Sequence, residues 1–218
     1  MMEYIGSILP TLLSGLVITG EIFFLTIVLS LPLGILLAIF RLSRLRVVRD
    51  LVATYIYVMR GTPLMLQILF IYYGLPLLPG VEVQFGDFTA AMIAFVANYA
   101  AYFAEIFRGG IQSISRGQYE GAKVLGMTYG QTMRHIILPQ VVKRVLAPVG
   151  NETITLLKDT SLVYVLAMND LMRMTRSVVQ RDFDTTAFFV AGVIYLFCTF
   201  VLTRLLARLE RHYAVYEE

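Results

Sequence analysis

The sequence predicts an all-α membrane protein with five transmembrane helices, the amino terminus outside the cell and the carboxy terminus inside. Three observations lead to this fold class. Only 15% of the 218 residues are charged and 58% are hydrophobic, whereas soluble domains carry about a quarter charged residues. Several apolar segments reach the roughly 20 residues that a helix needs to cross a membrane. Arginines gather in alternate loops, as expected for loops on the cytoplasmic side.

Four of the five spans follow from hydropathy alone. The segment Gly61-Thr62-Pro63 interrupts the second of these, because proline cannot continue a helix. The remaining segment is less apolar, since Lys143 and Glu152 lie within it. The predicted spans cover residues 15–40, 52–78, 88–108, 136–158 and 185–206.

Charge placement supports the fifth span and sets the orientation. The loop after the first span holds four arginines against one aspartate, and the loop at 79–87 holds acidic charges only. No Lys or Arg precedes Arg41, so the chain begins without the basic region of a secretory signal. The loop after the third span and the carboxy terminus are both basic. An outside start and an inside finish require an odd number of spans, so the segment 136–158 should cross.

One loop, residues 158–184, agrees less well with this topology. It should lie outside, yet it contains Lys158 and three arginines. Within it, the segment 169–180 has apolar residues at helical spacing with the arginines elsewhere. We expect a short amphipathic helix on the outer face of the bundle, capped by Asn169 or Asp170.

Composition and missing motifs restrict the function. The chain has no internal repeat and should form a single membrane domain over residues 1–218. A single cysteine, Cys198, excludes an internal disulfide, and the small basic excess need not indicate nucleic acid. The sequence has no phosphate-binding GxxxxGK[ST] loop, no HExxH and no GxSxG. We therefore expect no cofactor or metal in this chain, and a partner that supplies the energy.

A polar, glycine-punctuated stretch, residues 116–135, lies between the third and fourth spans, and we call it the coupling elbow. Taken alone it could be a solvated helical loop. Its spacing is specific, however: Glu120, Gly121 and Ala122 are followed by Gly126, and then by the Ile-Leu-Pro pattern that ends at Pro139. This resembles the EAA motif of ABC importer permeases. The departure is Gly121, where the family usually has alanine.

Two further motifs carry the same resemblance. "RGTPLMLQ" (60–67) and "NETITLLKDTSLV" (151–163) resemble the polar amino acid branch of binding-protein-dependent importers, the histidine, arginine and glutamine type. The resemblance covers about residues 20 to 212. It implies the type I ABC importer permease fold with a cytoplasmic coupling helix, in the bacterial cytoplasmic (inner) membrane.

The resemblance also implies partners for this chain. These are two ATP-binding subunits that carry ATP and Mg, a second permease copy or homologue, an extracytoplasmic solute-binding protein, an amino-acid substrate and membrane lipid. The elbow would dock into a cleft on the ATP-binding subunit, with small residues letting that groove approach closely. Gly126 would end the elbow's first helix in the left-handed conformation. The residues expected at this contact are Tyr119, Glu120, Gly121, Ala122 and Gly126.

Polar residues inside the spans suggest a substrate pathway, because intramembrane polar groups tend to face a cavity or one another. On the third span three such residues share one helical face, and on the fourth span three more do the same. The alternative is structural: Asn98 and Tyr102 could join helices, and Lys158 could pair with Asp159. We expect Arg60 to extend toward the cytoplasmic interface. The predicted pathway residues are Gln67, Asn98, Tyr102, Glu105, Glu152, Thr155 and Asp159.

The sequence therefore predicts a permease subunit that works by alternating access and is not itself an enzyme. The excess of acids over bases on the two polar faces favours a cationic amino acid. A different class of function is an intramembrane enzyme that acts on lipid or peptide through Glu152 and Asp159. The missing nucleophile speaks against that alternative.

Overall fold

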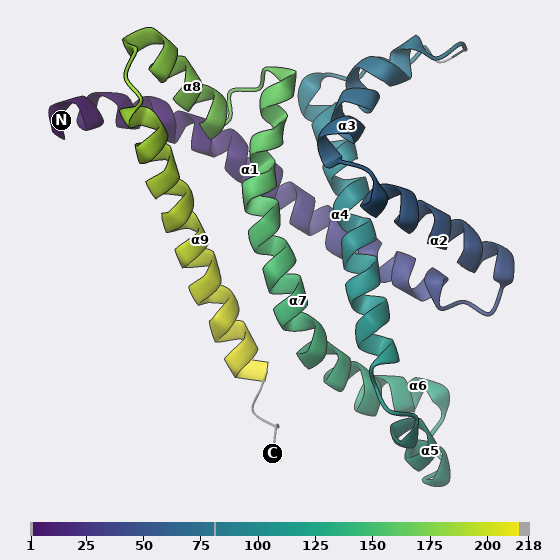
Figure 1. Ribbon diagram of the computed structural model, residues 1–218. Coiled ribbons are helices and arrows are strands. Elements are labelled where there is room, and N and C mark those ends of the chain that lie inside the picture. The colour runs from purple at the N-terminus through teal and green to yellow at the C-terminus, as the bar shows by residue number, and fades with distance from the viewer. Residues whose placement is uncertain (1, 81, 214–218) are drawn as a thin grey trace.

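The computed structural model describes residues 2–80 and 82–213, which form helices and short connections (Figure 1). The long helices are α1 (Met2–Arg41), α4 (Asp87–Gln112), α7 (Leu138–Asp159) and α9 (Thr186–Tyr213). The shorter ones are α2 (Arg46–Gly61), α3 (Leu64–Leu69), α5 (Arg116–Val124), α6 (Tyr129–Thr132) and α8 (Leu171–Asp182). Short π or 3₁₀ segments join them, η1 (Phe70–Gly74), η2 (Leu75–Leu77), η3 (Met133–Ile137) and η4 (Thr160–Leu166).

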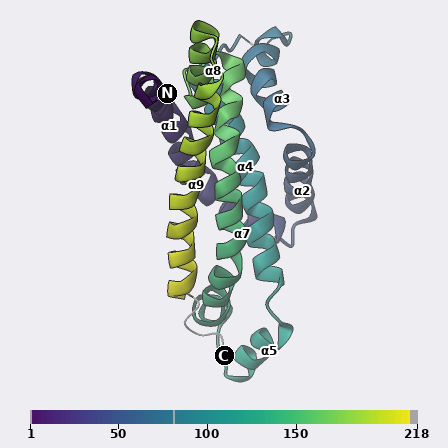
Figure 2. The ribbon, with the colours of Figure 1, turned by 60° about the vertical axis from the view of Figure 1, so that its left-hand side comes forward.

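Helix α4 lies at the centre of the hydrophobic core. Its aromatic residues Phe95, Tyr99 and Phe103 are fully buried, and they pack in one cluster with Ile22 of α1 and Leu156 of α7. Helix α7 runs beside α4, and α9 lies on its other side (Figure 2). The elbow helices α5 and α6 lie at one end of the molecule and α8 at the other (Figure 1).

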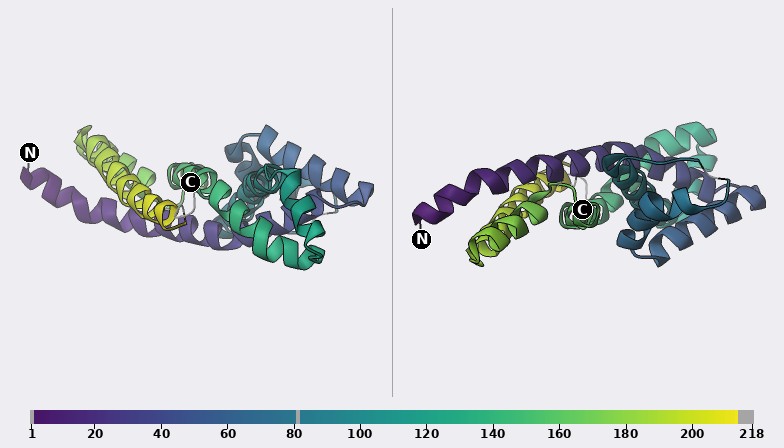
Figure 3. Two further views of the ribbon diagram at one scale, coloured as in Figure 1. Left: turned by 90° about the horizontal axis from the view of Figure 1, so that it is seen from below. Right: turned by 90° about the horizontal axis from the view of Figure 1, so that it is seen from above.

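Helix α1 has 40 residues and crosses α4 and α7 obliquely (Figures 1 and 3). It begins at Met2, well before the predicted span boundary at residue 15. The extension has a tertiary cause: Ile8 and Leu12 are fully buried in a cluster with Leu171 of α8 and Ala187 of α9. Packing on a distant part of the chain therefore continues the helix, although Pro10 lies within it.

The second predicted span is not one straight helix. Helix α2 and the helical segment Leu64–Leu77, which consists of α3, η1 and η2, meet at an angle of 105°. The break falls at the predicted position, since α2 ends at Gly61 and α3 follows Pro63. The Gln67 side-chain amide donates hydrogen bonds to the Met59 carbonyl (2.9 Å) and to the carbonyl and hydroxyl of Thr62 (3.2 and 2.8 Å). These bonds satisfy carbonyl groups that the break removes from the helix.

The number of spans stays a prediction. Within the described residues, α1, α4 and α9 are long and apolar enough to cross a membrane, and the bent α2–α3 pair would be a fourth. The apolar sequence of helix α7 is interrupted by charged residues such as Lys143 and Glu152, yet the helix packs between α4 and α9. Its position in the bundle is that of the predicted fourth span. The orientation of the termini is likewise a prediction.

Helix α8 confirms the predicted amphipathic helix and its cap. The Asp170 carboxylate accepts hydrogen bonds from the backbone N–H groups of Met172 and Arg173, both at 3.0 Å. Leu171, Thr175 and Val178 are buried. Through these residues the helix packs on α1 and α9.

Glycine allows the closest approach between α1 and α4. A Cβ on Gly34 would lie 2.7 Å from the Phe103 Cβ and 3.2 Å from the Ala100 carbonyl oxygen. Because these atoms belong to, or stand next to, the α4 backbone, they cannot move aside without moving the helix. Small residues serve the same purpose in other membrane helix pairs.

We therefore expect Gly34→Val to separate α1 from α4 and to lower the unfolding midpoint of the purified protein. Overpacking of this kind costs about 1–3 kcal/mol. The matched control is Gly20→Val on the same helix, where an added Cβ has no neighbour within 4 Å. Thermal unfolding in detergent compares the two variants. Equal midpoints would contradict the close approach.

Candidate functional site

A polar cavity of about 480 Å³ lies between the α2–α3 break, α4, α7 and η4, and we call it the central cavity. Five of the seven predicted pathway residues line it: Asn98, Tyr102, Glu152, Thr155 and Asp159. The structure therefore brings together the two polar faces that helical spacing predicted separately. The other polar or charged side chains in its wall are those of Arg60, Thr62 and Tyr99.

Gln67, a predicted pathway residue, has a structural role in this conformation. Its amide nitrogen is bound to the carbonyl groups of the helix break, and its amide oxygen accepts a hydrogen bond from Asn98 at 3.1 Å. The Asn98 amide also donates to the Met59 carbonyl at 2.9 Å. Asn98 thus joins α4 to the break, as the structural alternative expected, while it also lines the central cavity.

Glu105, another predicted pathway residue, is engaged by arginines. Its carboxylate accepts two hydrogen bonds from Arg108, at 2.9 and 2.6 Å, and lies 3.8 Å from the Arg60 guanidinium. It is not among the residues that line the central cavity. Helical spacing placed Glu105 correctly on the polar face of α4, but the nearby guanidinium groups of Arg60 and Arg108 compensate its charge.

Arg60 is the cavity residue that sequence reasoning missed. Its guanidinium lies 5.1 Å from the centre of the Tyr102 ring and lines the same cavity as Glu152 and Asp159. The predicted extension toward the cytoplasmic interface stays a prediction. Arg60 stands directly before the helix break, and the break residues Gly61, Thr62 and Pro63 form part of the same cavity wall. An arginine directly before a helix break in an apolar run was the available signal.

The two cavity carboxylates differ in their partners. Asp159 accepts a hydrogen bond from the Tyr99 hydroxyl at 2.8 Å, so its observed partner is Tyr99 and not Lys158, which the structural alternative had named. Glu152 has no hydrogen bond or ion pair with any residue that the structure describes. Its carboxylate is half-buried. A half-buried charge without a hydrogen-bond partner is costly.

The coupling elbow has the predicted glycine cap. Gly126 has φ +71°, and the N–H groups of Met127 and Gly126 donate to the carbonyls of Ala122 and Lys123, each at 3.0 Å. This pair of bonds is a Schellman motif, which ends α5 and sets the direction of the chain. Helix α6 then starts with a capping box formed by Thr128 and Gln131.

The surface of the elbow differs in part from the prediction. Glu120 and Gly121 are exposed, but Ala122 is only 2% exposed and packs within its own chain. Tyr119 is half-buried, and burial raises the pKa of its hydroxyl, with a smaller effect from Tyr129. Ala122 is therefore buried within its own chain, and its contact with an ATP-binding subunit stays a prediction.

Large apolar side chains on the elbow were not predicted as contact residues. Val124, Leu125 and Tyr129 are 87%, 77% and 75% exposed. They lie together around the turn from α5 to α6, and apolar groups gathered at a protruding end are typical of a surface that another protein covers. Their exposure could not be read from a helical pattern because they flank the glycine turn.

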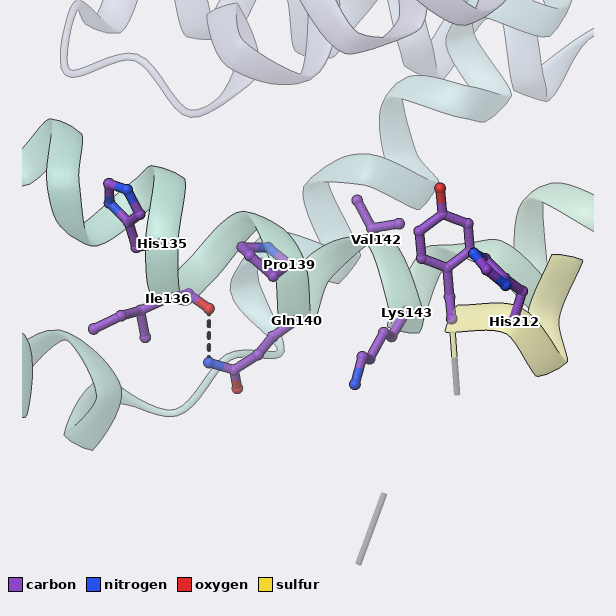
Figure 4. A pocket seen from close by; sticks show the side chains of 8 residues that line it. His135, Ile136, Pro139, Gln140, Val142, Lys143 and His212 are labelled. Atoms are coloured by element: carbon purple, nitrogen blue, oxygen red, sulfur yellow. Dashed lines mark hydrogen bonds between the residues drawn. The ribbon is translucent and has the colours of Figure 1, made fainter. Parts of the chain in front are cut away.

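A second cavity of about 500 Å³ lies at the base of the elbow (Figure 4). Figure 4 shows the side chains of His135 and His212 on opposite sides of it, and the Gln140 amide donating to the Ile136 carbonyl at 2.8 Å. Much of the wall is aliphatic, from Ile136 and from other residues of the same turn. Across the described part of the chain, no group of three or more His, Cys, Asp or Glu residues could hold a metal ion.

Comparison with known proteins identifies the family to which this chain belongs. Residues 30–215 match the family described as binding-protein-dependent transport system inner membrane component. The chain belongs to this family. It is 37% identical over 204 residues to the arginine transport system permease protein ArtQ of Bacillus subtilis (strain 168), covering 93% of this chain and 92% of ArtQ. It is 35% identical to the glutamine transport system permease protein GlnP of Escherichia coli (strain K12), covering 93% of each chain.

A solved structure supports the same assignment. The crystal structure of an amino acid ABC transporter with histidines has a chain that superposes with a TM-score of 0.89 at 33% identity, over 97% of this chain and 98% of that one. The predicted membership among amino acid ABC importer permeases is thereby confirmed, with the type I permease fold. In this family the chain is an inner membrane component that works with a solute-binding protein and an ATP-binding subunit.

Proposed function

We propose that this chain carries amino acids, with a preference for cationic ones, across the bacterial cytoplasmic membrane through the central cavity. The observation that carries this proposal is the meeting of Arg60, Glu152 and Asp159 in one polar cavity. The similarity to ArtQ and GlnP supports an amino acid as the cargo. ATP and Mg are assigned to two partner subunits, and a second permease copy or homologue completes the complex.

The charges of the cavity suit a zwitterion. A guanidinium binds a carboxylate through two parallel hydrogen bonds, so Arg60 is assigned to the α-carboxylate of the substrate. Glu152, which has no partner among the described residues, is assigned to a cationic group. Asp159 keeps its bond to Tyr99 and adds a second negative charge. Two carboxylates against one guanidinium favour a substrate with an extra positive charge.

Alternating access would use the elbow as the driven part. The exposed apolar residues Val124, Leu125 and Tyr129, together with Glu120 and Gly121, would dock into a cleft of the ATP-binding subunit. Movement of α5 and α6 would pass through the π-helical segment η3 directly into α7. Because Glu152 lies on α7, a tilt of that helix would change access to the central cavity.

No observation favours the enzyme alternative. Asp159 is hydrogen-bonded to a tyrosine, and the relatives are permeases.

The test is Glu152→Gln, assayed as binding of L-arginine and L-glutamine to the purified complex in nanodiscs without its solute-binding protein. A hydrogen bond to a charged group contributes about 1.5–3 kcal/mol, so we expect arginine affinity to fall by roughly tenfold or more. Glutamine affinity should change much less, because glutamine lacks the side-chain cation.

Glu21→Gln is the matched control, since Glu21 is exposed on α1 and does not line the central cavity. It should leave both affinities unchanged. If Glu152→Gln leaves the ratio of arginine to glutamine affinity as it is in the unmodified complex, Glu152 does not select the substrate.

A further inference from the structure

A row of polar and charged side chains leads from the central cavity toward the elbow end of α4. Arg60 lines the cavity, and its guanidinium lies 3.8 Å from the carboxylate of Glu105, which is outside the cavity wall. Glu105 accepts two hydrogen bonds from Arg108, and Arg108 also donates to Gln112 in the last turn of α4. The Arg60 guanidinium therefore lies between the cavity and a carboxylate behind it.

The two arginines hold Glu105 in different ways. The bonds from Arg108 are 2.9 and 2.6 Å long, and they join the guanidinium and the carboxylate in the paired geometry that these groups prefer. The contact with Arg60, at 3.8 Å, is too long for a hydrogen bond. Glu105 therefore attracts Arg60 while both of its oxygens already accept hydrogen bonds from Arg108.

Arg60 keeps its own donor groups available as a result. It makes no hydrogen bond to any residue that the structure describes, and its contacts are the loose ion pair with Glu105 and the ring of Tyr102, whose centre lies 5.1 Å away. An α-carboxylate in the central cavity could bind these donors in the paired geometry. It would then share the guanidinium with Glu105, and the two negative charges would compete for it.

The competing carboxylate stands on the side of the cavity that faces the elbow. Glu105 follows Tyr102 along α4, and α4 leads to the elbow helix α5 (Figure 1). If the elbow is cytoplasmic, Arg60 moves toward the cytoplasm when it turns from the substrate to Glu105. A transport pathway needs binding that is weak enough for the substrate to leave. Competition at Arg60 would weaken binding on the side where the substrate leaves.

We propose that Glu105 competes with the α-carboxylate of the substrate for Arg60 and so speeds release, while Arg108 restrains Glu105 and limits this competition. The inference rests on the proposed function, which assigns Arg60 to the substrate carboxylate. Glu105 and Arg108 are positioning residues, since both act through Arg60. A purely structural ion pair would behave differently, because loss of either partner would disturb α4 and the cavity in the same direction.

Two single variants should therefore change substrate affinity in opposite directions. The assay is binding of L-arginine and of its carboxamide to the complex in nanodiscs without the solute-binding protein. In Glu105→Gln the competing charge is absent, so we expect L-arginine to bind about three- to fivefold more tightly and to dissociate more slowly. In Arg108→Gln the Glu105 carboxylate is free to pair with Arg60, so the affinity should fall by a similar factor. The carboxamide lacks the competing charge, and its affinity should change by less than about twofold in both variants.

The double variant Glu105→Gln, Arg108→Gln separates competition from a general disturbance of α4. Without Glu105 there is no carboxylate for Arg108 to restrain, so the double variant should bind L-arginine as tightly as Glu105→Gln alone, and the two effects should not add. Asp50→Asn is the control for the loss of an acidic charge. Asp50 is an exposed residue of the same helix as Arg60, and it pairs with Arg49 outside the central cavity. This control should leave both affinities unchanged.

Weaker binding of L-arginine in both single variants, or in the double variant, would overturn the competition and leave the ion pair a structural role. Unchanged affinity in Glu105→Gln would overturn it as well. These results would leave the transport function standing. An unmodified complex that binds no amino acid, or that binds the acid and the carboxamide equally, would instead overturn the proposed function, of which the role of Arg60 is a part.

Discussion

Valine in place of Gly126 should strongly reduce amino-acid uptake while ATP hydrolysis without the solute-binding protein continues. Gly126 has φ +71°, a conformation that costs an L-residue about 1–2 kcal/mol and a β-branched one more. The Schellman bonds from Met127 and Gly126 to α5 would be lost, and the angle between α5 and α6 would change. We expect uptake into vesicles that hold the complete complex to fall by at least about tenfold.

Gly117→Val is the matched control for this experiment. Gly117 is an exposed glycine of the same helix α5, with ordinary backbone angles and open space around its Cα. Its valine variant should transport normally, so a difference between the two variants reports the left-handed position and not the added bulk. Normal uptake by the Gly126 variant would show that the elbow does not depend on this cap.

Glutamine in place of Arg60 should remove recognition of the substrate α-carboxylate. Loss of a paired, charged hydrogen bond in a partly enclosed cavity costs about 2–3 kcal/mol, which corresponds to a roughly 30- to 150-fold loss of affinity. Binding of L-arginine and of its carboxamide to the nanodisc complex, without the solute-binding protein, measures the effect. The unmodified complex should prefer the free acid, and Arg60→Gln should remove that preference.

The fold should survive this change. Glu105, the carboxylate 3.8 Å from Arg60, keeps its two shorter bonds to Arg108. Arg60→Lys, which retains the charge but not the paired geometry, should give an intermediate loss. Equal weakening of the acid and the carboxamide by Arg60→Gln would point to a role for Arg60 in shaping the cavity, against direct carboxylate binding.

Local signals in the sequence predicted the elements that depend on neighbouring residues. The helix break before Pro63, the cap at Asp170 and the left-handed turn at Gly126 each follow from the chemistry of a few adjacent residues. Helical spacing likewise placed Asn98 with Tyr102 on α4. It placed Glu152 with Asp159 on α7, and the two faces meet in the central cavity.

Features that depend on how helices cross could not be predicted in this way. Arg60 lines a cavity whose wall includes the helix break itself, where the chain turns by 105° after Gly61. Gln67 was predicted to line the pathway, but its side-chain amide donates hydrogen bonds to carbonyl groups that the same turn removes from the helix. The burial of Ala122 depends on how α5 folds back on its own chain, and a motif does not contain that information.

Helix α1 has a consequence for the surrounding bilayer. Its 40 residues correspond to about 60 Å at 1.5 Å per residue, roughly twice the thickness of a hydrocarbon core. Such a helix fits a bilayer by leaning over, by stretching the lipid around it or by extending beyond the hydrocarbon core. Because α1 contacts α8 at one end and α2 at the other, a change in its lean would affect both contacts. We therefore expect the acyl-chain length of the surrounding lipid to affect transport.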